Sequence, residues 1–400
     1  MADTINEISV APIPARHWTE LGRNAYTPEG LGVTRTEWLV RARTTAGVEG
    51  LANARQSVTA EGGSVARLVA DLREVFLGRS VDSLLEIADG HAVAAGSELR
   101  QALATWGWMD TLAVDLVSRT RGESIATLLG ERRRDRIPAY ESTTYFQDLL
   151  LPQRGVGEVI AHACRGFADG FRQFKIKVGR GGRVMTPNAG LHRDIEVVLG
   201  IRDALGPDVK LMVDANFGYD GQPENLEEFV RATSPARLTW LEEMVTASVD
   251  AYRTLRDLQA RYCPETLLVA GEVDSDPPSG AFVDLIDQEL IDGYQPDIVR
   301  IGHLRWKQLE ARLAEKSILP IPHNFGNGRF GLIAGLALAT SLYRWVALED
   351  ERIRPNVYAD DELTVVNGAY QAPDGPGLGI DVDDDAYERV GTANEVVIHA

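Results

Sequence analysis

The fold is decided by two apolar segments and the charged residues that end them, FKIKV at residues 174–178 and VKLMVDAN at residues 209–216. Each segment is typical of a buried strand. Between them a helical pattern runs until it is stopped by Gly206-Pro207. A strand, a helix and a second strand in this order indicate an α/β fold with parallel strands.

This unit is repeated down the second half of the chain. Six successive apolar runs close on the words Lys175-Ile176-Lys177, Asp214-Ala215-Asn216, Trp240-Leu241-Glu242-Glu243, Gly271-Glu272, Pro296-Asp297 and Pro322-His323. Their reactive residues lie 37, 28, 30, 25 and 26 positions apart, about one unit of a (β/α)8 barrel, in which roughly 250 residues make eight units. We therefore predict a closed (β/α)8 barrel with its active site at these strand ends.

The flanking regions have other patterns. Residues 38–43 and 51–54 flank a turn and predict a β-hairpin, and from about residue 66 the period becomes helical. We predict an α+β domain over residues 1–134 and a barrel over residues 135–368, whose first strand is 137–140. A C-terminal segment, 369–400, is expected to pack back on the first domain.

Composition narrows the class of protein. The chain is 44% hydrophobic and 25% charged, as in an ordinary soluble protein, and its net charge of −18 argues against nucleic acid and anionic membranes as partners. No apolar run reaches transmembrane length and no signal peptide is evident, so a cytoplasmic protein is expected. Cys164 and Cys263 form no metal or disulfide pattern and are predicted to be core residues.

Three carboxylates, Asp214, Glu242 and Glu272, follow three successive predicted strands. Acids that converge in one pocket repel one another and are costly to bury without a cation. Oxygen ligands without Cys or His favour a hard ion, so we predict one Mg²⁺ bound by these residues. The alternative is that each acid is a solvated loop carboxylate.

Lys175 and Lys177 lie two residues apart on one predicted strand, so they point the same way. Two adjacent ammonium groups lower each other's pKa, and a nearby cation lowers both further. A lysine moved towards neutrality can accept a proton, which predicts a general base. A surface-exposed lysine pair is the alternative.

Asp297 and His323 end the next two predicted strands. A carboxylate beside an imidazole fixes its tautomer and raises its pKa, which predicts an acid–base pair. His303, six residues after Asp297, is the competing partner. We prefer His323 because it follows its own strand at 319–322.

Two glycine-rich words remain. GRGGR at residues 179–183 follows a strand but lacks the spacing of nucleotide-binding loops, so no nucleotide site is predicted. GNGRFG at residues 326–331 opens a helix after His323. It either offers backbone N–H groups to an anion or is simply a turn, and the two interpretations stand equal.

With these residues the chain resembles the enolase superfamily, mandelate racemase subgroup, over nearly its whole length. Segments 45–50, 115–116 and 128–130 are similar to the family's capping domain, and 373–379 is similar to its C-terminal segment. The resemblance implies a modified (β/α)8 barrel, with an α+β capping domain built from the N-terminal region and the C-terminal segment. It also implies one Mg²⁺ per subunit and a homo-oligomer, either a dimer or an octamer.

The resemblance also implies the chemistry. The metal would bind the substrate carboxylate and stabilise the enediolate formed when the α-proton leaves. Lys177 would work on one face of the α-carbon and His323, oriented by Asp297, on the other. Lys175 would tune Lys177 and touch the carboxylate.

Further substrate contacts are expected from Asn216, Arg300 and Glu349, with Asp360 fitting the place of Glu349 about as well. Two short motifs differ from the sequences that are usual in the family. Its Glu-Glu-Pro is Glu242-Glu243-Met244 here, and its Lys-x-Gly-Gly is Arg300-Ile301-Gly302-His303. Neither change removes a ligand or a base, but both could reshape the pocket. The loop at 23–30 is expected to close over the barrel mouth.

These features predict a hydro-lyase of carbohydrate catabolism, an acid-sugar dehydratase that converts an aldonate or aldarate to a 2-keto-3-deoxy acid. A racemase or epimerase of a 2-hydroxy acid, using the same Lys/His pair, is the alternative. A noncatalytic binding protein on this fold and a nucleotide-dependent oxidoreductase are more remote alternatives.

Overall fold

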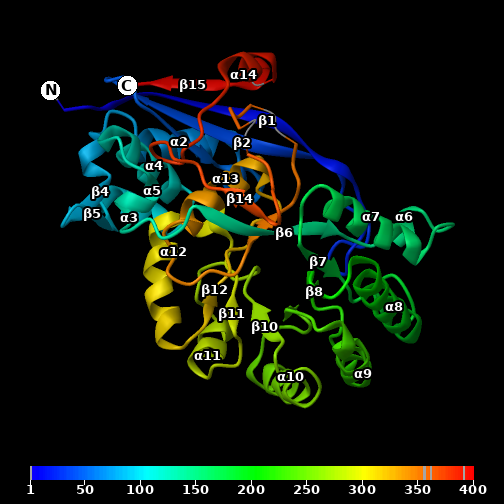
Figure 1. The fold of residues 1–400 in the computed structure, drawn as a ribbon. Helices are drawn as coiled ribbons and strands as arrows, with labels where there is room; N and C mark the ends of the chain where they lie inside the picture. Colours follow the sequence, from blue (N-terminus) through cyan, green and yellow to red (C-terminus); the bar gives the residue numbers. More distant parts are fainter. Residues whose placement is uncertain (1, 355–356, 361–362, 391) are drawn as a thin grey trace.

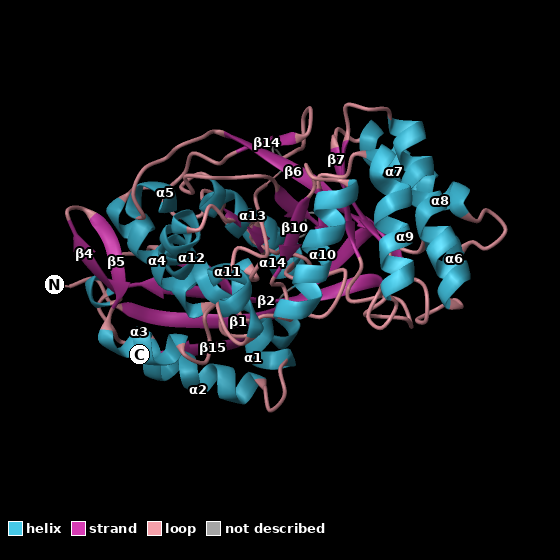
Figure 2. Ribbon diagram, turned by 90° about the horizontal axis from the view of Figure 1, so that it is seen from below, coloured by secondary structure: helices cyan, strands magenta, loops and turns pink. Residues whose placement is uncertain are grey.

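The computed structural model describes residues 2–354, 357–360, 363–390 and 392–400. A four-stranded sheet and a larger curled sheet lie side by side, and helices cover both (Figures 1 and 2). Among the described residues, no helix combines the length and apolar character needed to span a membrane.

The four-stranded antiparallel sheet joins the two ends of the chain. Its order is β15-β1-β2-β3, and the predicted hairpin is confirmed as β2 and β3, with Leu39 opposite Asn53. The last strand pairs with the first, so that Ile398 lies opposite Ile8. The four strands are β1 (Ile5–Leu21), β2 (Gly32–Thr44), β3 (Glu49–Asn53) and β15 (Val396–His399).

Helices and a small hairpin pack beside this sheet. They are α1 (Arg55–Thr59), α2 (Val65–Val75), η1 (Val81–Ser83), β4 (Leu85–Ala88), β5 (His91–Ala95), α3 (Ser97–Leu103), α4 (Met109–Arg121) and α5 (Ile125–Leu128). On α2, Leu68, Leu72 and Val75 form one buried face at helical spacing.

The curled sheet contains eight parallel strands, and the (β/α)8-type architecture is confirmed. In chain order they are β6 (Arg136–Thr144), β7 (Gln173–Lys177), β8 (Lys210–Asp214), β9 (Trp240–Glu242), β10 (Leu267–Ala270), β11 (Gly293–Tyr294), β12 (Leu319–Pro320) and β13 (Leu348–Asp350). A ninth strand, β14 (Ala369–Gln371), runs antiparallel to β6.

Helices follow the strands around the barrel. They are α6 (Gln147–Leu150), α7 (Val156–Ala168), α8 (Pro187–Leu205), α9 (Pro223–Thr233), η2 (Ser234–Ala236), α10 (Val249–Tyr262), α11 (Ala281–Asp287), α12 (Ile298–Glu315) and α13 (Gly328–Ala339). Near the C-terminus, α14 (Asp384–Val390) and η3 (Thr392–Asn394) precede β15.

The barrel differs from the prediction at one seam. The last strand, β13, pairs with the first, β6, but within the described ranges no strand ladder joins β12 to β13. Pro320 and Pro322 lie at this seam, and a proline has no N–H to donate to a ladder. The hydrogen-bonded sheet is therefore curled but open between β12 and β13.

A compact apolar layer fills the barrel below the strand ends. Its buried residues come from six strands or their ends: Tyr140, Met212, Trp240, Val269, Ile321 and Ala347. Such inward-facing layers make the barrel interior a packed core. Because side chains alternate along a strand, the polar residues two positions further along, such as Asp214 after Met212 and Glu242 after Trp240, point into the site from a rigid base.

Helix α4 also supports the barrel. Asp110 accepts hydrogen bonds from the backbone N–H groups of Leu304 and Arg305, at 2.9 and 3.1 Å. The chain kinks there at Gly302, whose φ of +77° and contact with the Asp110 side chain exclude a larger residue. The departure at 300–303 thus retains a glycine where the backbone needs one.

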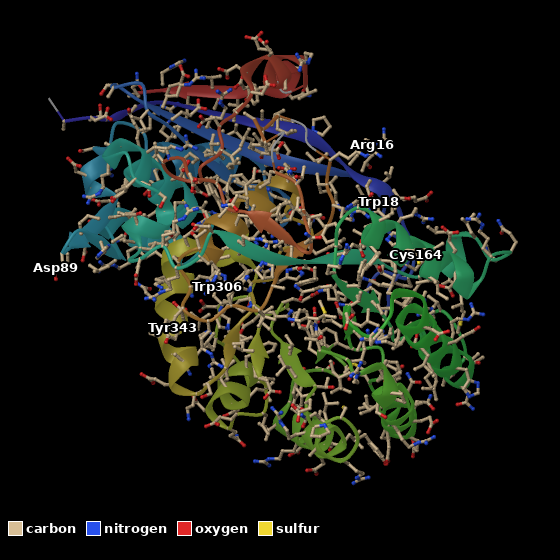
Figure 3. All side chains as sticks on the ribbon, in the orientation of Figure 1. Arg16, Trp18, Asp89, Cys164, Trp306 and Tyr343 are labelled. Atoms are coloured by element: carbon tan, nitrogen blue, oxygen red, sulfur yellow. The ribbon has the colours of Figure 1, made fainter. Side chains whose placement is uncertain are left out.

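The prediction that both cysteines are core residues is wrong for Cys164, which is exposed on α7 (Figure 3). The buried face of α7 includes His162, Ala163 and Gly166, and Cys164 falls outside that face. Cys263 is partly buried and packs against the core.

Candidate active site

The three predicted metal ligands come together at the strand ends. Asp214 and Glu242 are the last residues of β8 and β9, and Glu272 lies two residues beyond β10. One carboxylate oxygen from each lies within 4.8 Å of the other two. Gly271 allows this turn, because its φ is +129° and a Cβ there would meet the ring of Tyr294.

The pKa values of two of these acids are shifted in opposite directions. Burial, reinforced by Asp214, raises the pKa of Glu242 to about 8 despite the ammonium of Lys175. The pKa of Asp214 is lowered instead, because Lys177 and Lys175 outweigh its burial. Glu242 Oε2 also accepts a hydrogen bond from Trp240 Nε1 at 2.8 Å, which holds the carboxylate in place.

Both lysines contact the acids directly. Lys175 Nζ lies 2.8 Å from Glu242 and 2.8 Å from Glu349, and 3.5 Å from Asp214. Lys177 Nζ donates hydrogen bonds to Asp214 and, at 2.8 Å, to Asn216 Oδ1.

The expected lowering of the lysine pKa values is not found. Burial alone would lower the pKa of each lysine, but the neighbouring carboxylates raise the pKa of both above the ordinary value. The sequence argument counted the two ammonium groups and a nearby cation, whereas carboxylates also surround the lysines in the folded protein.

The Asp/His pair is present in the described structure. His323 Nδ1 lies 3.1 Å from Asp297 Oδ2, and its Nε2 lies 3.3 Å from Glu272. Burial would lower the pKa of His323, but Glu349, Glu272 and Asp297 together raise it to about 9. An imidazolium at neutral pH can donate a proton.

The competing histidine lies elsewhere. His303 is buried between Thr111 Oγ1, at 3.2 Å from Nδ1, and the carbonyl oxygen of Ala334, at 3.0 Å from Nε2. Burial lowers its pKa to about 4. His303 therefore packs against α4 and α13 as a neutral side chain.

The candidate substrate contacts divide into two groups. Glu349 lies inside the charge cluster: it contacts Lys175, and its Oε2 lies 3.6 Å from His323 Nε2. Its alternative, Asp360, pairs with Arg329 instead. Asn216 contacts Lys177, as given above, whereas Arg300 Nη1 donates to the carbonyl oxygen of Asp274 at 3.2 Å.

Glu243 belongs to the cluster but no role was predicted for it. Its side chain is buried, and neither carboxylate oxygen has a hydrogen-bond partner in the described structure. Burial, together with Glu272, Asp214 and Glu242, raises its pKa well above the usual range. The sequence offered the adjacent pair Glu242-Glu243 as a signal, but only Glu242 was counted in the series of strand-end residues.

The glycine-rich words bind internal carboxylates. In the first, the N–H groups of Gly179 and Arg180 donate to Asp194 at 2.7 and 3.2 Å. In the second, the N–H of Gly328 donates to Glu351 at 2.6 Å and that of Arg329 donates to Glu37 at 2.8 Å. These amides are already satisfied, which favours the interpretation of the second word as a structural turn.

The donor set fits a hard divalent cation. All three ligands are oxygens, two of the acids are fully buried, and Glu272 Oε2 is a buried oxygen without a hydrogen-bond partner in the described structure. Within the cluster, carboxylates outnumber cations six to three, as Asp214, Glu242, Glu243, Glu272, Asp297 and Glu349 against Lys175, Lys177 and His323. A bound Mg²⁺ would offset this excess.

Comparison with known proteins identifies the family. More than half of the chain, residues 158–386, matches the family described as "Enolase C-terminal domain-like". The protein belongs to the enolase superfamily. Its barrel, capping sheet and acidic triad are therefore features of a member of this superfamily.

Two curated relatives of this superfamily member have different activities. The chain is 27% identical to D-galactarolactone cycloisomerase of Agrobacterium fabrum, over 71% of this chain and 73% of that protein. It is 23% identical to arabinonate dehydratase of Saccharolobus solfataricus, over 72% of each chain.

Solved structures extend the likeness to the full length. A variant of galacturonate dehydratase from Geobacillus sp., complexed with Mg, superposes with a TM-score of 0.83 at 25% identity, over 100% of this chain and 97% of that one. The same enzyme, complexed with D-galacturonate and 5-keto-4-deoxy-D-galacturonate, gives a TM-score of 0.80 at 26% identity, over 97% and 98%.

Proposed function

We propose that this member of the enolase superfamily is a Mg²⁺-dependent acid-sugar dehydratase. The observation that supports it most is the position of two proton-carrying groups at different ligands of the triad. Lys177 is bonded to Asp214, whereas His323 lies 3.3 Å from Glu272. A substrate carboxylate at the triad would place its α-carbon between them.

Lys177 takes the α-proton in this proposal. When bound by Asp214, Glu242 and Glu272, Mg²⁺ supplies positive charge that favours both a neutral lysine and the enediolate. Asn216 accepts a hydrogen bond from Lys177 Nζ and so directs the amine. Lys175, between Glu242 and Glu349, stays charged and stabilises the carboxylate oxygens.

His323 completes the elimination. Its Nε2 proton goes to the β-hydroxyl, the β-carbon–oxygen bond breaks, and water leaves with the electron pair of that bond. The resulting enol takes up a proton and becomes a 2-keto-3-deoxy acid. Asp297 keeps Nδ1 hydrogen-bonded throughout, which fixes the ring with Nε2 facing the triad.

The direct test is a screen of aldonates and aldarates with Mg²⁺, read as 2-keto acid formation. We expect at least one acid to react and activity to vanish when Mg²⁺ is chelated. Dehydration that continues after full chelation, or no 2-keto acid from any compound in the screen, would contradict the proposal.

An isomerase is the second candidate, because the relatives include two cycloisomerases at 27% and 28% identity. It would use the same proton abstraction but retain every atom of the substrate. A product of unchanged mass, formed from a sugar-acid lactone without 2-keto-3-deoxy acid, would favour this candidate over dehydration.

A further inference from the structure

Arg35 reaches the reactive end of the barrel from the capping sheet. It lies on β2, and its guanidinium carbon is 5.9 Å from the centre of the Phe325 ring. Phe325 follows His323 by two residues, and its N–H donates to Glu349 Oε2 at 3.1 Å. The guanidinium therefore lies against the loop that carries His323, the proposed proton donor.

Its charge is only partly compensated. Nη1 donates to the carbonyl oxygens of Leu31 and Thr34, at 3.1 and 3.0 Å. In the described structure no carboxylate forms an ion pair with Arg35, whereas the three most buried arginines each have one. Those are Arg41 with Asp384, Arg180 with Asp148 and Asp194, and Arg329 with Asp360.

The surroundings of Arg35 leave this charge available. The half-buried guanidinium has a lowered pKa because burial and Arg55 outweigh the acid that faces it, Glu351. That carboxylate forms no ion pair with Arg35: its Oε1 accepts the N–H of Gly328, and its Oε2 has no hydrogen-bond partner in the described structure. A partly desolvated guanidinium without a bonded acid can bind an anionic ligand strongly.

Two aromatic rings connect Arg35 to the reacting groups. The Phe325 ring lies 5.5 Å from that of Tyr145, and Tyr145 lies 5.3 Å from Lys177 Nζ. The six-carbon chain of an acid sugar spans about 6 Å, from C–C bonds of about 1.5 Å. A substrate that leaves Lys177 along these rings would bring its far end towards Arg35.

We propose that Arg35 binds a second carboxylate at the far end of the substrate, so that the substrates are diacids (aldarates) rather than aldonates. The inference rests on the proposed dehydratase function. Phe325 and Tyr145 form the wall of this subsite, and Tyr145 is a neutral donor because burial raises its pKa above the ordinary value.

Matched acid pairs test the inference. Galactarate and galactonate, like glucarate and gluconate, differ only in whether the far carbon is a carboxylate or a hydroxymethyl group. We expect wild type to favour the reactive diacid in kcat/KM by tenfold or more. Arg35→Gln should lower that value about ten- to hundredfold, mainly through KM, and leave the aldonate value unchanged. Arg35→Lys should retain part of the preference.

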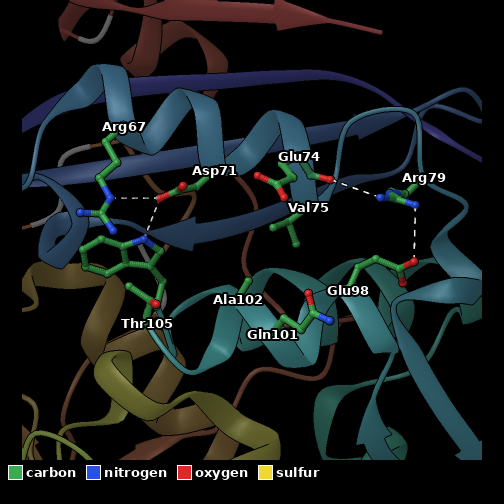
Figure 4. A pocket seen from close by; sticks show the side chains of 10 residues that line it. Arg67, Asp71, Glu74, Val75, Arg79, Glu98, Gln101, Ala102 and Thr105 are labelled. Carbon is green, nitrogen blue, oxygen red and sulfur yellow. Dashed lines mark hydrogen bonds and ion pairs between the residues drawn. The ribbon is translucent and has the colours of Figure 1, made fainter.

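The control is Arg67→Gln. Arg67 also lies in the N-terminal region and over an aromatic ring, Trp106 at 5.4 Å, but it lines a surface groove between α2 and α3 (Figure 4). Arg67→Gln should leave kcat/KM for both the diacid and the aldonate unchanged, and thermal unfolding of each variant checks that it is folded. Equal kcat/KM for both acids in wild type, or an equal loss for both in Arg35→Gln, overturns the inference.

A separate measurement distinguishes this inference from the function on which it rests. If no acid is dehydrated, the dehydratase proposal fails, and the same four acids are titrated into wild type and Arg35→Gln by calorimetry with Mg²⁺ present. Diacid selectivity that is lost in Arg35→Gln would still support the subsite. Equal affinities, or no binding by any of the four, would overturn it.

Discussion

Two buried charge clusters, one around Arg180 and one around Lys177, differ in how their charge is balanced. Their central cations lie only three residues apart along the chain. In the first, Arg180 bonds Asp148 and Asp194 at 2.9 and 2.6 Å, and Arg193 bonds Asp148 at 2.8 Å. All four carboxylate oxygens have partners, since Tyr219 and the backbone complete Asp194. Two cations balance two acids.

The second cluster, around Lys175 and Lys177, does not reach such a balance. Its carboxylates exceed its cations, and both oxygens of Glu243 and one of Glu272 lack hydrogen-bond partners in the described structure. A cluster that satisfies itself stabilises the fold, whereas one left with excess charge and unpartnered oxygens can bind a cation and a substrate. We propose that this difference in charge balance distinguishes a structural cluster from a reactive one.

The largest expected effect comes from removing Lys177, the proposed base, from the unbalanced cluster. Lys177→Met should lower turnover of the substrate identified in the screen by about a thousandfold or more, because no other described side chain bonds both Asp214 and Asn216 in its place. The matched control is Lys210→Met, an exposed lysine at the start of β8. Steady-state 2-keto acid formation measures both, and normal turnover in Lys177→Met would remove Lys177 from the mechanism.

The balanced cluster should respond in stability instead. Asp194→Asn leaves Arg180 with one carboxylate in a buried site, so we expect the free energy of unfolding to fall by about 3–5 kcal/mol. Asp276→Asn breaks the exposed pair with Arg305 and should cost less than about 1 kcal/mol. Urea unfolding measures the free energy of unfolding of both variants. Equal losses would show that charge balance within the Arg180 cluster does not stabilise the fold.

The smallest effect contrasts two buried histidines. His323 faces carboxylates, whereas His303 faces a hydroxyl and a carbonyl and has its pKa lowered to about 4. Between pH 6.5 and 4 His303 therefore binds a proton in the unfolded chain but not in the folded protein. The contribution of neutral His303 to the free energy of unfolding is present above pH 6.5 and is lost as the pH falls.

At pH 5 the loss should be about 2 kcal/mol relative to pH 7. His303→Gln removes the titrating group and should reduce the difference between the two pH values by that amount, whatever its effect at neutral pH. Urea unfolding at both pH values gives the answer. An unchanged difference would mean that His303 does not titrate as a buried neutral side chain.

Much of the reactive cluster could be predicted because a repeating strand–helix unit brings strand ends together. The positions of Asp214, Glu242 and Glu272 at successive strand ends were enough to predict that they meet. The next two strand ends predicted the pair of Asp297 and His323 in the same way. The capping hairpin likewise followed from local alternation.

The rest depended on contacts between distant parts of the chain. Arg180 lies in a glycine-rich word that was considered as a phosphate loop, and only folding brings Asp148 and Asp194 to it. The direction of the lysine pKa shifts required a count of surrounding carboxylates. Arg35 meets Phe325 across 290 positions, which no local pattern encodes.

The division of labour between Lys177 and His323 is the central claim, and proton exchange in His323→Asn tests it most directly. The variant is incubated with Mg²⁺ and the substrate in D2O and followed by NMR. We predict that deuterium enters at the α-carbon through Lys177 while 2-keto acid formation is lost. Normal dehydration by His323→Asn would contradict the claim.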